Sequence, residues 1–542
     1  MFIIGIVTLA FCLSGGACYA ETATSDHSSR EVIARAVEPL PTSQGNIYTL
    51  SKIKLQGIHL SSNDLVTDDE LDLIVGRYKG KDISFEQLEE IRQELIRIII
   101  GKGYVNSGVI IPDQQVKDGV ISFTVISGQL TRVELTGNRY FSTDYLRSRL
   151  ERGALQPLNV TILQENLQLL QADPRIKTIN AELAPGEKSG ESVLKTRIEE
   201  KNPLTLRVEA ANNDPPSTGA YRGDVIASYS NLMGVGDSIE GRFGITEGNL
   251  DYGARLRAPL NSHDTTMEAY FRRGENTVIE DLHRKLDIKS KDDTYGLRIS
   301  QPIIFDLSHQ LTVSLAGEYR TSATSMLGEE YSLSAGAVDG KSRLTALRFG
   351  QEYIYRAMDH VLALSSCLSF GVNVLGATIN DDGQPDGRFF SWLAQALYIM
   401  KIGETEAVFR SDAQLSNDQL LSMEKFSIGG NGSVRGYRKS LFVRDNGVSG
   451  ALELRVPIFS NGKGEQVLSL IPFYDFGYAW DNHDVTGQQN SFIQSIGGGF
   501  KWSPFSNVAM EFYYGFPLRH ISQPDKDPQD YGIHFNVSWQ IL

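Results

Sequence analysis

The sequence predicts a mostly β protein: a 16-stranded antiparallel transmembrane β-barrel over residues 204–542, preceded by two small α+β domains. Three observations carry this prediction. The N-terminus has the pattern of an export signal, residues 46–203 contain an internal repeat, and residues 204–542 alternate apolar and polar side chains in segment after segment. Together they indicate an exported chain whose larger part crosses a membrane with strands.

The N-terminal end, residues 1–20, is expected to be removed from the mature protein. An apolar run from Phe2 to Leu13 is followed by small residues and by Cys-Tyr-Ala, which is the pattern of a signal peptide cleaved after Ala20. The run is too short for a transmembrane helix, which needs about 20 apolar residues. We therefore assign residues 1–20 as a signal peptide.

Residues 21–45 are rich in Ser, Thr and Pro around a short apolar series that runs from Val32 to Leu40. The spacing of this series suits about two helical turns, which Pro39 and Pro41 would end, and so short a helix is unstable alone. Two interpretations stay open. The segment is either a linker or a small helix that docks into a later part of the chain.

Composition argues against several classes of function. The net charge is −14 and no block of basic residues occurs, which speaks against a nucleic-acid partner. Once the signal peptide is cleaved, Cys367 is the remaining cysteine, so we expect no internal disulfide and interpret Cys367 as a packing residue. The nine histidines show no metal-ligand spacing. We expect no enzyme activity, no cofactor and no metal site.

The internal repeat defines two domains, residues 46–129 and residues 130–203. The segment Lys-Ile-Lys-Leu-Gln-Gly, which ends at Gly57, returns as Arg-Val-Glu-Leu-Thr-Gly, which ends at Gly137. Each copy is followed by a helical pattern and then by two strands, so each domain is a small α+β unit. The order strand, helices, strand, strand favours an antiparallel or mixed sheet with an exposed edge, to which a guest strand could add.

The clearest helix of the repeat follows Ser84, which has the capping-box spacing with Gln87. In the second copy a helix is expected over residues 160–171. Gly101 and Gly103 are expected to end the first helix. Its apolar face is formed by Leu88, Ile91, Leu95, Ile98 and Ile99.

The region from residue 204 on changes character. Leu206 and Val208 alternate with Arg207 and Glu209, and the same alternation recurs to the end of the chain. An apolar side and a charged side over about ten residues are typical of a strand in a membrane barrel. A soluble sandwich would also alternate, but the signal peptide, the number of segments and their aromatic ends favour lipid. Sixteen segments are centred near Leu206, Val225, Phe243, Ala254, Ala269, Leu297, Val313, Phe349, Leu364, Leu393, Val408, Leu452, Phe473, Gly497, Glu511 and Phe535.

The connections between segments supply an internal check. If the first strand rises from the two small domains, every second connection lies on the periplasmic side, and these connections are short, such as Leu-Asn-Ser-His and Gly-Glu-Thr. The others are mostly longer and include residues 274–291, 321–340 and 415–446. Outer-membrane barrels have short periplasmic turns and long external loops, and an even strand number lets the sheet close. The last segment, around Phe535, suits insertion by the barrel-assembly machinery.

One long connection carries the stretch Gly-Gly-Asn-Gly-Ser-Val-Arg-Gly-Tyr, residues 429–437. Its glycines let the backbone fold back tightly, because glycine accepts positive φ without penalty. If the loop enters the lumen, Arg435 needs an anion, since an unpaired buried charge is costly. The spacing does not fit a nucleotide-binding glycine motif, and no helix follows. The alternative is a surface hairpin whose arginine is solvated.

The strand centred on Phe473 offers that anion. With Tyr474 and Phe476 facing lipid, Asp475 faces inward, and Gly477 leaves room for a close-packed loop. We therefore expect Arg435 and Asp475 to form a bidentate ion pair.

The glycine-rich motif, together with Phe-Tyr-Asp-Phe-Gly at residues 473–477, resembles the two-partner secretion outer-membrane transporters. These TpsB proteins, of the ShlB/FhaC/HecB type, belong to the superfamily of the barrel-assembly insertase BamA. The resemblance covers nearly the whole mature chain. It implies that the two repeats are polypeptide-transport-associated (POTRA) domains and that residues 204–542 form the sixteen-stranded barrel. Residues 212–225 resemble the family's opening strand pair.

The resemblance also implies a site. In the family, the arginine of the loop motif pairs inside the barrel with the aspartate of the later strand. Many members carry an N-terminal helix that plugs the pore, although the segment before the first repeat is short here. The residues expected to form a loop latch are Val434, Arg435, Gly436, Tyr437, Phe473, Asp475 and Gly477, with the loop glycines Gly429, Gly430 and Gly432.

The function implied by the resemblance is two-partner, or type V, secretion. An outer-membrane pore would recognise a partner exoprotein in the periplasm through its POTRA domains and translocate it to the cell surface. The cargo would be a TpsA-type protein, such as an adhesin, a haemolysin or a contact-dependent toxin. The alternative is an insertase for other barrel proteins, but insertases generally carry more than two repeats. A passive porin would leave the repeats without a role.

Overall fold

The computed structural model describes residues 52–542 apart from 62–64, 189, 381–382, 463, 484–490 and 524–525, together with the paired strands β1 (Val7–Thr8) and β2 (Glu21–Thr22). The predicted signal peptide and the predicted linker or helix at 21–45 otherwise lie outside the described residues. The chain divides into two compact units, with the boundary between Lys201 and Asn202. None of the helices in the described ranges is both long and apolar enough to cross a membrane.

The N-terminal unit begins with a small domain built on a mixed sheet. Strand β7 (Val120–Ile126) is central, with β4 (Gly57–Ser61) parallel to it and β6 (Gly108–Ile110) antiparallel, so β4 and β6 are the sheet edges. The remaining elements are the paired strands β3 (Ile53–Lys54) and β5 (Asp82–Ile83) and the helices α1 (Asp68–Val75) and α2 (Phe85–Gly101).

Helix α2 forms for the reasons that its sequence predicts. The Ser84 side chain accepts a hydrogen bond from the backbone N–H of Gln87, and the Gln87 side chain accepts one from the backbone N–H of Ser84, which completes the capping box. The helix ends at Gly101, before the left-handed Gly103. Its face of Leu88, Ile91, Leu95 and Ile99 is buried in the domain core.

A second domain of the same order follows, with a core of its own. Strand β10 is central, parallel to β8 and antiparallel to β9. Both sheets are thus of the mixed type expected from the order strand, helices, strand, strand. The elements are β8 (Gln129–Thr136), α3 (Thr143–Leu150), α4 (Val160–Gln171), β9 (Ile176–Pro185) and β10 (Glu191–Glu200).

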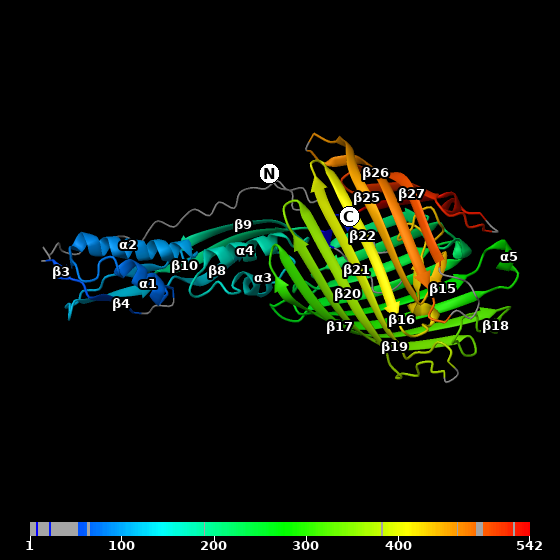
Figure 1. The fold of residues 1–542 in the computed structure, drawn as a ribbon, viewed down its shortest axis with the longest axis horizontal. Coiled ribbons are helices and arrows are strands. Elements are labelled where there is room, and N and C mark those ends of the chain that lie inside the picture. Colours follow the sequence, from blue (N-terminus) through cyan, green and yellow to red (C-terminus); the bar gives the residue numbers. More distant parts are fainter. Residues whose placement is uncertain are drawn as a thin grey trace. The chain divides into compact units, whose positions relative to one another are not determined.

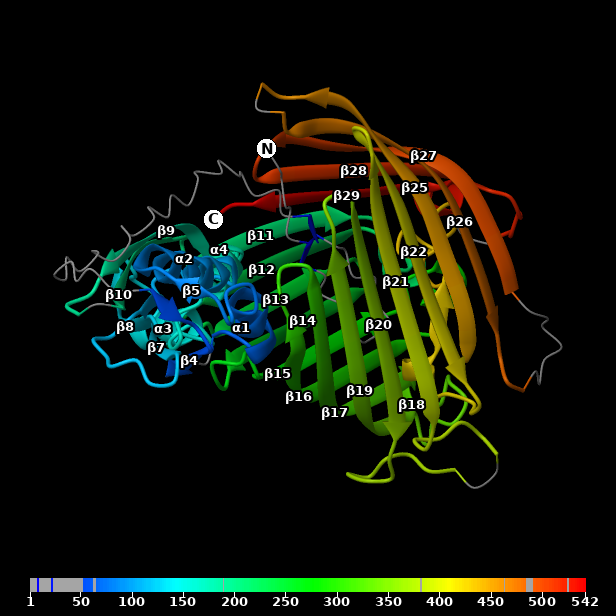
Figure 2. The ribbon, with the colours of Figure 1, turned by 60° about the vertical axis from the view of Figure 1, so that its left-hand side comes forward.

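The C-terminal unit is a closed antiparallel barrel (Figures 1 and 2). Among the described residues, sixteen strands of at least eight residues form its wall, which confirms the predicted fold class, and each predicted segment centre falls in a different strand. In chain order the strands are β11 (Leu204–Ala211), β12 (Arg222–Ser230), β13 (Ser238–Ile245), β14 (Asn249–Pro259), β15 (Thr266–Thr277), β16 (Lys289–Phe305), β17 (His309–Met326), β19 (Lys341–Arg356), β20 (His360–Gly371), β21 (Phe390–Ile402), β22 (Thr405–Ser416), β25 (Asn446–Ser460), β26 (Gln466–Trp480), β27 (Ser491–Phe505), β28 (Val508–Pro517) and β29 (Ile533–Gln540).

The barrel closes where the first and last strands meet. Strands β11 and β29 pair antiparallel from Arg207 opposite Gln540 to Ala211 opposite Asn536. Connections at the end of the barrel where β12 joins β13 are short, the longest spanning residues 231–237, whereas residues 417–445 form the longest connection at the opposite end. The short β18 (Glu329–Glu330), α5 (Asp281–Arg284), η1 (Pro216–Thr218) and η3 (Pro528–Tyr531) lie in connections at that opposite end.

The outer face of the wall is apolar. Alternate residues on each strand expose large hydrophobic side chains, while their neighbours in sequence point into the barrel. An exposed apolar surface that continues over neighbouring strands is a lipid-facing surface in a protein of this architecture. Examples on the first strands are Val225, Phe243, Tyr252, Leu256, Leu297 and Ile299.

The substitution Leu297→Arg tests this orientation, because Leu297 is 49% exposed on the outer face of β16. A charge placed there in lipid is expected to cost about 2–4 kcal/mol of the free energy of unfolding. Denaturant unfolding of the protein in lipid vesicles measures the change. Ser300→Arg, on the opposite face of the same strand, is the matched control and should cost much less. Equal costs for the two variants would contradict the assignment of the faces.

Candidate functional site

The candidate site is the connection between β22 and β25, residues 417–445, which we call the hairpin loop. Within it, β23 (Phe426–Ile428) pairs antiparallel with β24 (Phe442–Arg444), and η2 (Ser422–Glu424) precedes β23. The stretch between β23 and β24 carries the glycine-rich motif. Its residues are largely buried, so the loop is packed inside the barrel and is not a solvated surface hairpin.

Three of the four motif glycines have the conformation that the sequence suggested. Gly429, Gly430 and Gly436 have φ of 109°, 87° and 91°. A Cβ on Gly436 would lie 2.9 Å from the carbonyl oxygen of Gly515 on β28, so the backbone of the loop touches the barrel wall there. Gly432 differs, because it is exposed and is not among the residues with positive φ. The tight fold therefore depends on the other three glycines.

The structure brings Arg435 and Asp475 together inside the barrel. Arg435 Nε donates to Asp475 Oδ2 at 2.8 Å, and Nη2 donates to Oδ1 at 2.7 Å. The backbone N–H of Arg435 also donates to Oδ2, at 3.0 Å. Arg435 is 1% exposed and Asp475 is 0% exposed. The contact is therefore a buried bidentate pair, reinforced by one bond from the main chain.

A second carboxylate, which the sequence analysis missed, completes the charge balance. Arg435 Nη1 lies 2.9 Å from Glu453 Oε1, and Arg410 Nη2 donates to the same oxygen at 2.7 Å. Two arginines thus face two carboxylates, of which Arg435, Asp475 and Glu453 are buried and Arg410 is partly exposed. Because buried charges are stable only when they are paired and hydrogen-bonded, Glu453 is as much a part of the site as Asp475.

Aromatic and apolar neighbours surround the pair. The Arg435 guanidinium carbon lies 3.5 Å from the ring centroid of Phe473 and 4.9 Å from that of Tyr513. Val434 packs over Gly477. A Cβ on Gly477 would lie only 2.9 Å from Cγ2 of Val434, so the glycine does leave the space that the loop occupies. The Tyr437 hydroxyl lies 3.0 Å from the carbonyl oxygen of Gln494 on β27.

The residues that follow Arg435 bind further parts of the wall. The backbone N–H of Gly436 donates to His534 Nε2 on β29 at 3.1 Å. Arg438 Nε and Nη2 donate to Asp530 at 2.9 and 2.7 Å, and its Nη1 donates to Glu280 at 2.8 Å. Consecutive residues of the loop are therefore tied to β26, β29 and two external connections.

Lys439 and Gln529 link the loop to the seam between β11 and β29. The backbone N–H of Lys439 donates to Gln529 Oε1 at 2.8 Å. Gln529 is fully buried, and its Nε2 donates to the carbonyl oxygens of Asn212 and Asp214 at 2.7 and 2.8 Å. The Asn212 side chain in turn donates to the Ile533 carbonyl oxygen at 2.8 Å. Side chains thus continue the closing contact beyond the last paired residues of the two strands.

The start of the hairpin loop is anchored to another part of the wall. Glu424 Oε1 accepts from Arg320 on β17 at 2.7 Å and from Arg348 on β19 at 2.8 Å. Arg348 also donates to Glu318 at 2.7 Å. The loop is therefore held by buried ion pairs near its start and in its glycine-rich motif, and its contacts spread around the barrel interior.

Few of these partners had a sequence signal. Glu453 could have been predicted from the sequence, because it follows Leu452 in a predicted strand and alternation places its side chain on the inward face. His534 has the inward parity in the last strand in the same way. Gln529 and Asp530 lie in a connection with no periodic pattern, so nothing in the sequence pointed to them.

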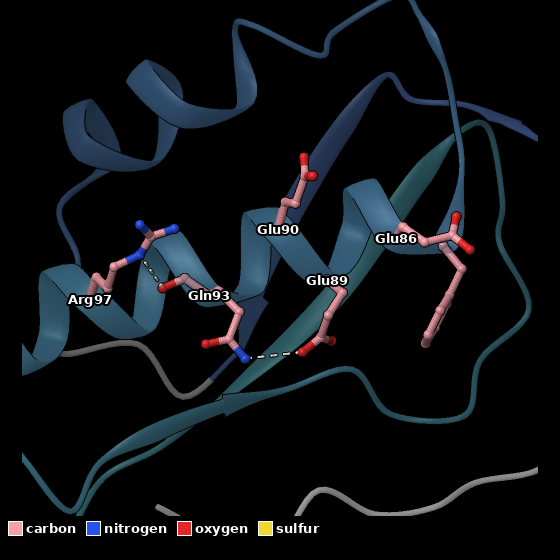
Figure 3. Close-up of a pocket in the computed structure, with 6 residues that line it drawn as sticks. Glu86, Glu89, Glu90, Gln93 and Arg97 are labelled. Carbon is pink, nitrogen blue, oxygen red and sulfur yellow. Dashed lines mark hydrogen bonds between the residues drawn. The ribbon is translucent and has the colours of Figure 1, made fainter.

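A hollow of about 530 Å³ lies along the outer face of α2 (Figure 3). It is lined by Phe85 and by polar side chains that include Glu86, Glu89 and Gln93, with no Ser, Cys or His. Gln93 Nε2 donates to Glu89 within the same helix, at 3.1 Å. In the described ranges, no three His, Cys, Asp or Glu side chains gather as a metal-ligand set requires. The buried ion pairs of the hairpin loop are thus the more specific feature.

Comparison with known proteins shows which family has this architecture. Residues 190–502 match the family described as haemolysin secretion/activation protein ShlB/FhaC/HecB. The chain belongs to this family. Residues 53–128 match the POTRA domain of ShlB type. The protein is therefore an outer-membrane secretion protein with its POTRA region in the periplasm, and the family match favours this assignment over the insertase alternative.

Relatives of the ShlB/FhaC/HecB family align over nearly the full chain. The heme/hemopexin transporter protein HuxB of Haemophilus influenzae (strain 86-028NP) is 22% identical over 96% of this chain and 96% of its own. The outer membrane transporter CdiB of Escherichia coli is 23% identical over 95% of this chain and 86% of its own. The structure of CdiB from Escherichia coli has a TM-score of 0.71 at 19% identity and covers 94% of both chains, which shows a shared fold.

The substitution Arg435→Ala leaves Asp475 and Glu453 buried with too few counter-charges. We expect a loss of about 3–5 kcal/mol of stability in the loop, and a fall in secretion of the partner protein by roughly tenfold or more, with normal insertion into the outer membrane. Secreted and membrane-bound protein are measured separately. Arg444→Ala in the same hairpin loop is the control, because Arg444 pairs with Asp481 at 3.3 Å in a less buried place. Unchanged secretion by Arg435→Ala would remove the pair from the transport mechanism.

The substitution Gln529→Leu leaves the Asn212 and Asp214 carbonyl oxygens and the Lys439 N–H without their partner. Each such buried group costs about 1–3 kcal/mol, so the barrel should unfold at a lower temperature. The measurement is the temperature at which the folded, faster-migrating band disappears on electrophoresis. Gln540→Leu, an exposed amide on β29, should leave that temperature unchanged. A shift of equal size in the control would argue against a special role for Gln529.

Proposed function

We propose that the chain exports one large partner protein, which enters from the periplasm unfolded and folds only after it reaches the cell surface. The observation that carries this proposal is the hairpin loop, which is held inside the barrel by the buried pairs of Arg435 and Glu424. A loop fixed in this way occupies part of the barrel interior, so an extended chain would suit the remaining passage better than a folded domain. We assign the loop latch the task of keeping this arrangement.

Directionality would come from folding outside the cell. The family acts at the outer membrane, where no nucleotide is available to drive transport. A chain that folds on the far side can no longer slide back through a passage too narrow for its folded form. The charged lumen would hold each segment weakly, because exposed ion pairs contribute only about 0–1 kcal/mol each.

The POTRA region would select the client by strand addition. The first sheet has two edge strands, β4 and β6, and we propose that an extended segment pairs along one of them. Ile110 on β6 is exposed, which gives such a segment an apolar contact at its edge. Main-chain hydrogen bonds would supply affinity, and neighbouring side chains would supply selectivity.

The client is expected to be a secreted TpsA-type protein. The relatives are named as a heme/hemopexin transporter protein and as an outer membrane transporter. These names do not single out one kind of client for this chain. The proposed class therefore includes adhesins, haemolysins and contact-dependent toxins. We further propose that the barrel-assembly machinery inserts the chain and that outer-membrane lipid covers its apolar outer face. A gene for a long secreted β-helical protein next to this one would identify the client.

A photo-crosslinking residue at Ile110 tests client recognition. With the partner protein present in the periplasm, crosslinking to the N-terminal secretion domain of that partner is expected, because the segment would pair along β6. The same residue placed at Arg77, which is exposed but lies outside the sheet edge, is the matched control. Crosslinks at Arg77 and none at Ile110 would rule out addition at this edge.

A further inference from the structure

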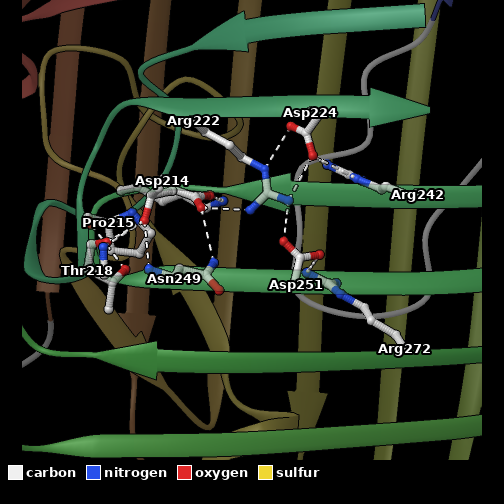
Figure 4. A network of polar contacts seen from close by, with 12 residues as sticks. Asp214, Pro215, Thr218, Arg222, Asp224, Arg242, Asn249, Asp251 and Arg272 are labelled. Atoms are coloured by element: carbon white, nitrogen blue, oxygen red, sulfur yellow. Dashed lines mark hydrogen bonds and ion pairs between the residues drawn. The ribbon is translucent and has the colours of Figure 1, made fainter. Parts of the chain in front are cut away.

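A second group of charges lines the barrel wall on strands β12 to β15 (Figure 4). At its centre is Arg222, whose side chain is only 5% exposed. Arg222 Nη1 donates to Asp214 at 2.9 Å and Nε donates to Asp224 at 2.7 Å, and Nη2 also contacts Asp251. One buried arginine therefore binds three shielded carboxylates.

Two of these carboxylates, and one on the neighbouring part of the wall, each pair with a further arginine, whereas Asp214 pairs with Lys439 at 3.4 Å. Asp224 pairs with Arg242 at 3.0 Å, and Asp251 pairs with Arg272 at 3.4 Å. On the same wall Glu268 pairs with Arg255 at 3.9 Å. The set that we call the arginine face consists of Arg242, Arg255 and Arg272.

The two partners of each pair differ in their access to solvent. The side chains of Arg242, Arg255 and Arg272 are 45%, 44% and 55% exposed, whereas Asp224, Glu268 and Asp251 are 6%, 17% and 2% exposed. The carboxylates lie against the wall, and the guanidinium groups cover them. At each of these three pairs, the group that is more exposed to the lumen is therefore the positive guanidinium, although the pair itself is neutral.

The strand register keeps this surface continuous. Arg242 on β13 and Arg272 on β15 lie opposite the same residue of β14, Gly253. Because Gly253 has no side chain, nothing from β14 stands between the two arginines. Arg255 lies two residues further along β14 and points to the same side. Three guanidinium groups from three neighbouring strands thus share one patch.

The part of the wall under the hairpin loop has the opposite character. Arg348 on β19, Glu453 on β25 and Asp475 on β26 are all less than a tenth exposed, because the loop and its ion pairs cover them. A chain inside the barrel can thus reach the charges of the arginine face more easily than those of the loop latch.

We propose that the arginine face binds acidic, extended segments of the chain being exported; this rests on the transport function proposed above. Guanidinium groups present planar donors that match carboxylates, and their shielded partners hold them in place without blocking them. Membrane lipid cannot reach a surface inside the barrel. An unfolded chain that carries Asp and Glu fits it, and half-exposed pairs bind such a chain weakly enough to release it.

The experiment measures binding of a fluorescein-labelled oligoglutamate to the full-length protein in detergent, by fluorescence anisotropy at low and at high salt. We expect the triple variant Arg242→Gln/Arg255→Gln/Arg272→Gln to bind roughly tenfold more weakly than the wild type, and salt to weaken wild-type binding. Oligolysine should bind no better to the wild type than to the triple variant. Arg272→Gln alone, at the most exposed of the three, is a milder variant that is expected to fold.

Arg273→Gln is the matched control, because Arg273 is the next residue on β15 and faces the outside, where Nη2 donates to Asp293 at 3.0 Å. This variant should bind oligoglutamate as the wild type does. Equal binding by the wild type and Arg272→Gln, or no binding by the wild type, would overturn the arginine face. Export of the partner protein is measured separately, so a failure of export would count against the transport function and not against this surface.

Discussion

A buried guanidinium is the constraint on which the barrel interior depends. Arg435 is almost fully enclosed, and a charge in such a place is tolerated only where counter-charges and hydrogen bonds meet it from several directions. Asp475 and Glu453 supply them from two adjacent strands, and the Arg435 backbone N–H adds a further hydrogen bond to Asp475. The position of the hairpin loop and the register of β25 against β26 are therefore set together, because neither can shift without exposing an unpaired charge.

The same loop connects regions that lie far apart in sequence. Beyond Arg435 its contacts reach β29 through His534 and the closing seam through Gln529 and Lys439. Before it, Glu424 reaches β17 and β19. The hairpin loop is thus bonded to the seam between β11 and β29 and also to β17 and β19. Its position is therefore linked to the closure of the barrel. Movement of the loop and opening of the seam would thus break hydrogen bonds of the same network.

One alternating pattern of side chains suits both surroundings of the barrel wall, lipid outside and water or the loop inside. Outward residues meet lipid, so they are apolar, and inward residues meet water or the loop, so they are polar or charged. Within the inward set, burial separates two groups of ion pairs. Pairs that the loop covers hold the structure, whereas Arg242 and Arg272 keep their guanidinium groups accessible above shielded carboxylates.

The sequence by itself determined the features that depend on neighbouring residues. Helix α2, with its Ser84 capping box, and the sixteen strands follow from periodicity, which is a local property of the chain. Strand parity and the family resemblance also predicted the pairing of Arg435 with Asp475. The predicted boundaries of the two POTRA domains and the role of the loop latch stay predictions. Only the tertiary structure decided that Glu453 and His534 bind the loop motif and that Gln529 ties the loop to the seam. Strand parity places Glu453 and His534 on the inward face, but their partners are fixed only when the sheet closes, and Gln529 lies in a connection with no periodic pattern.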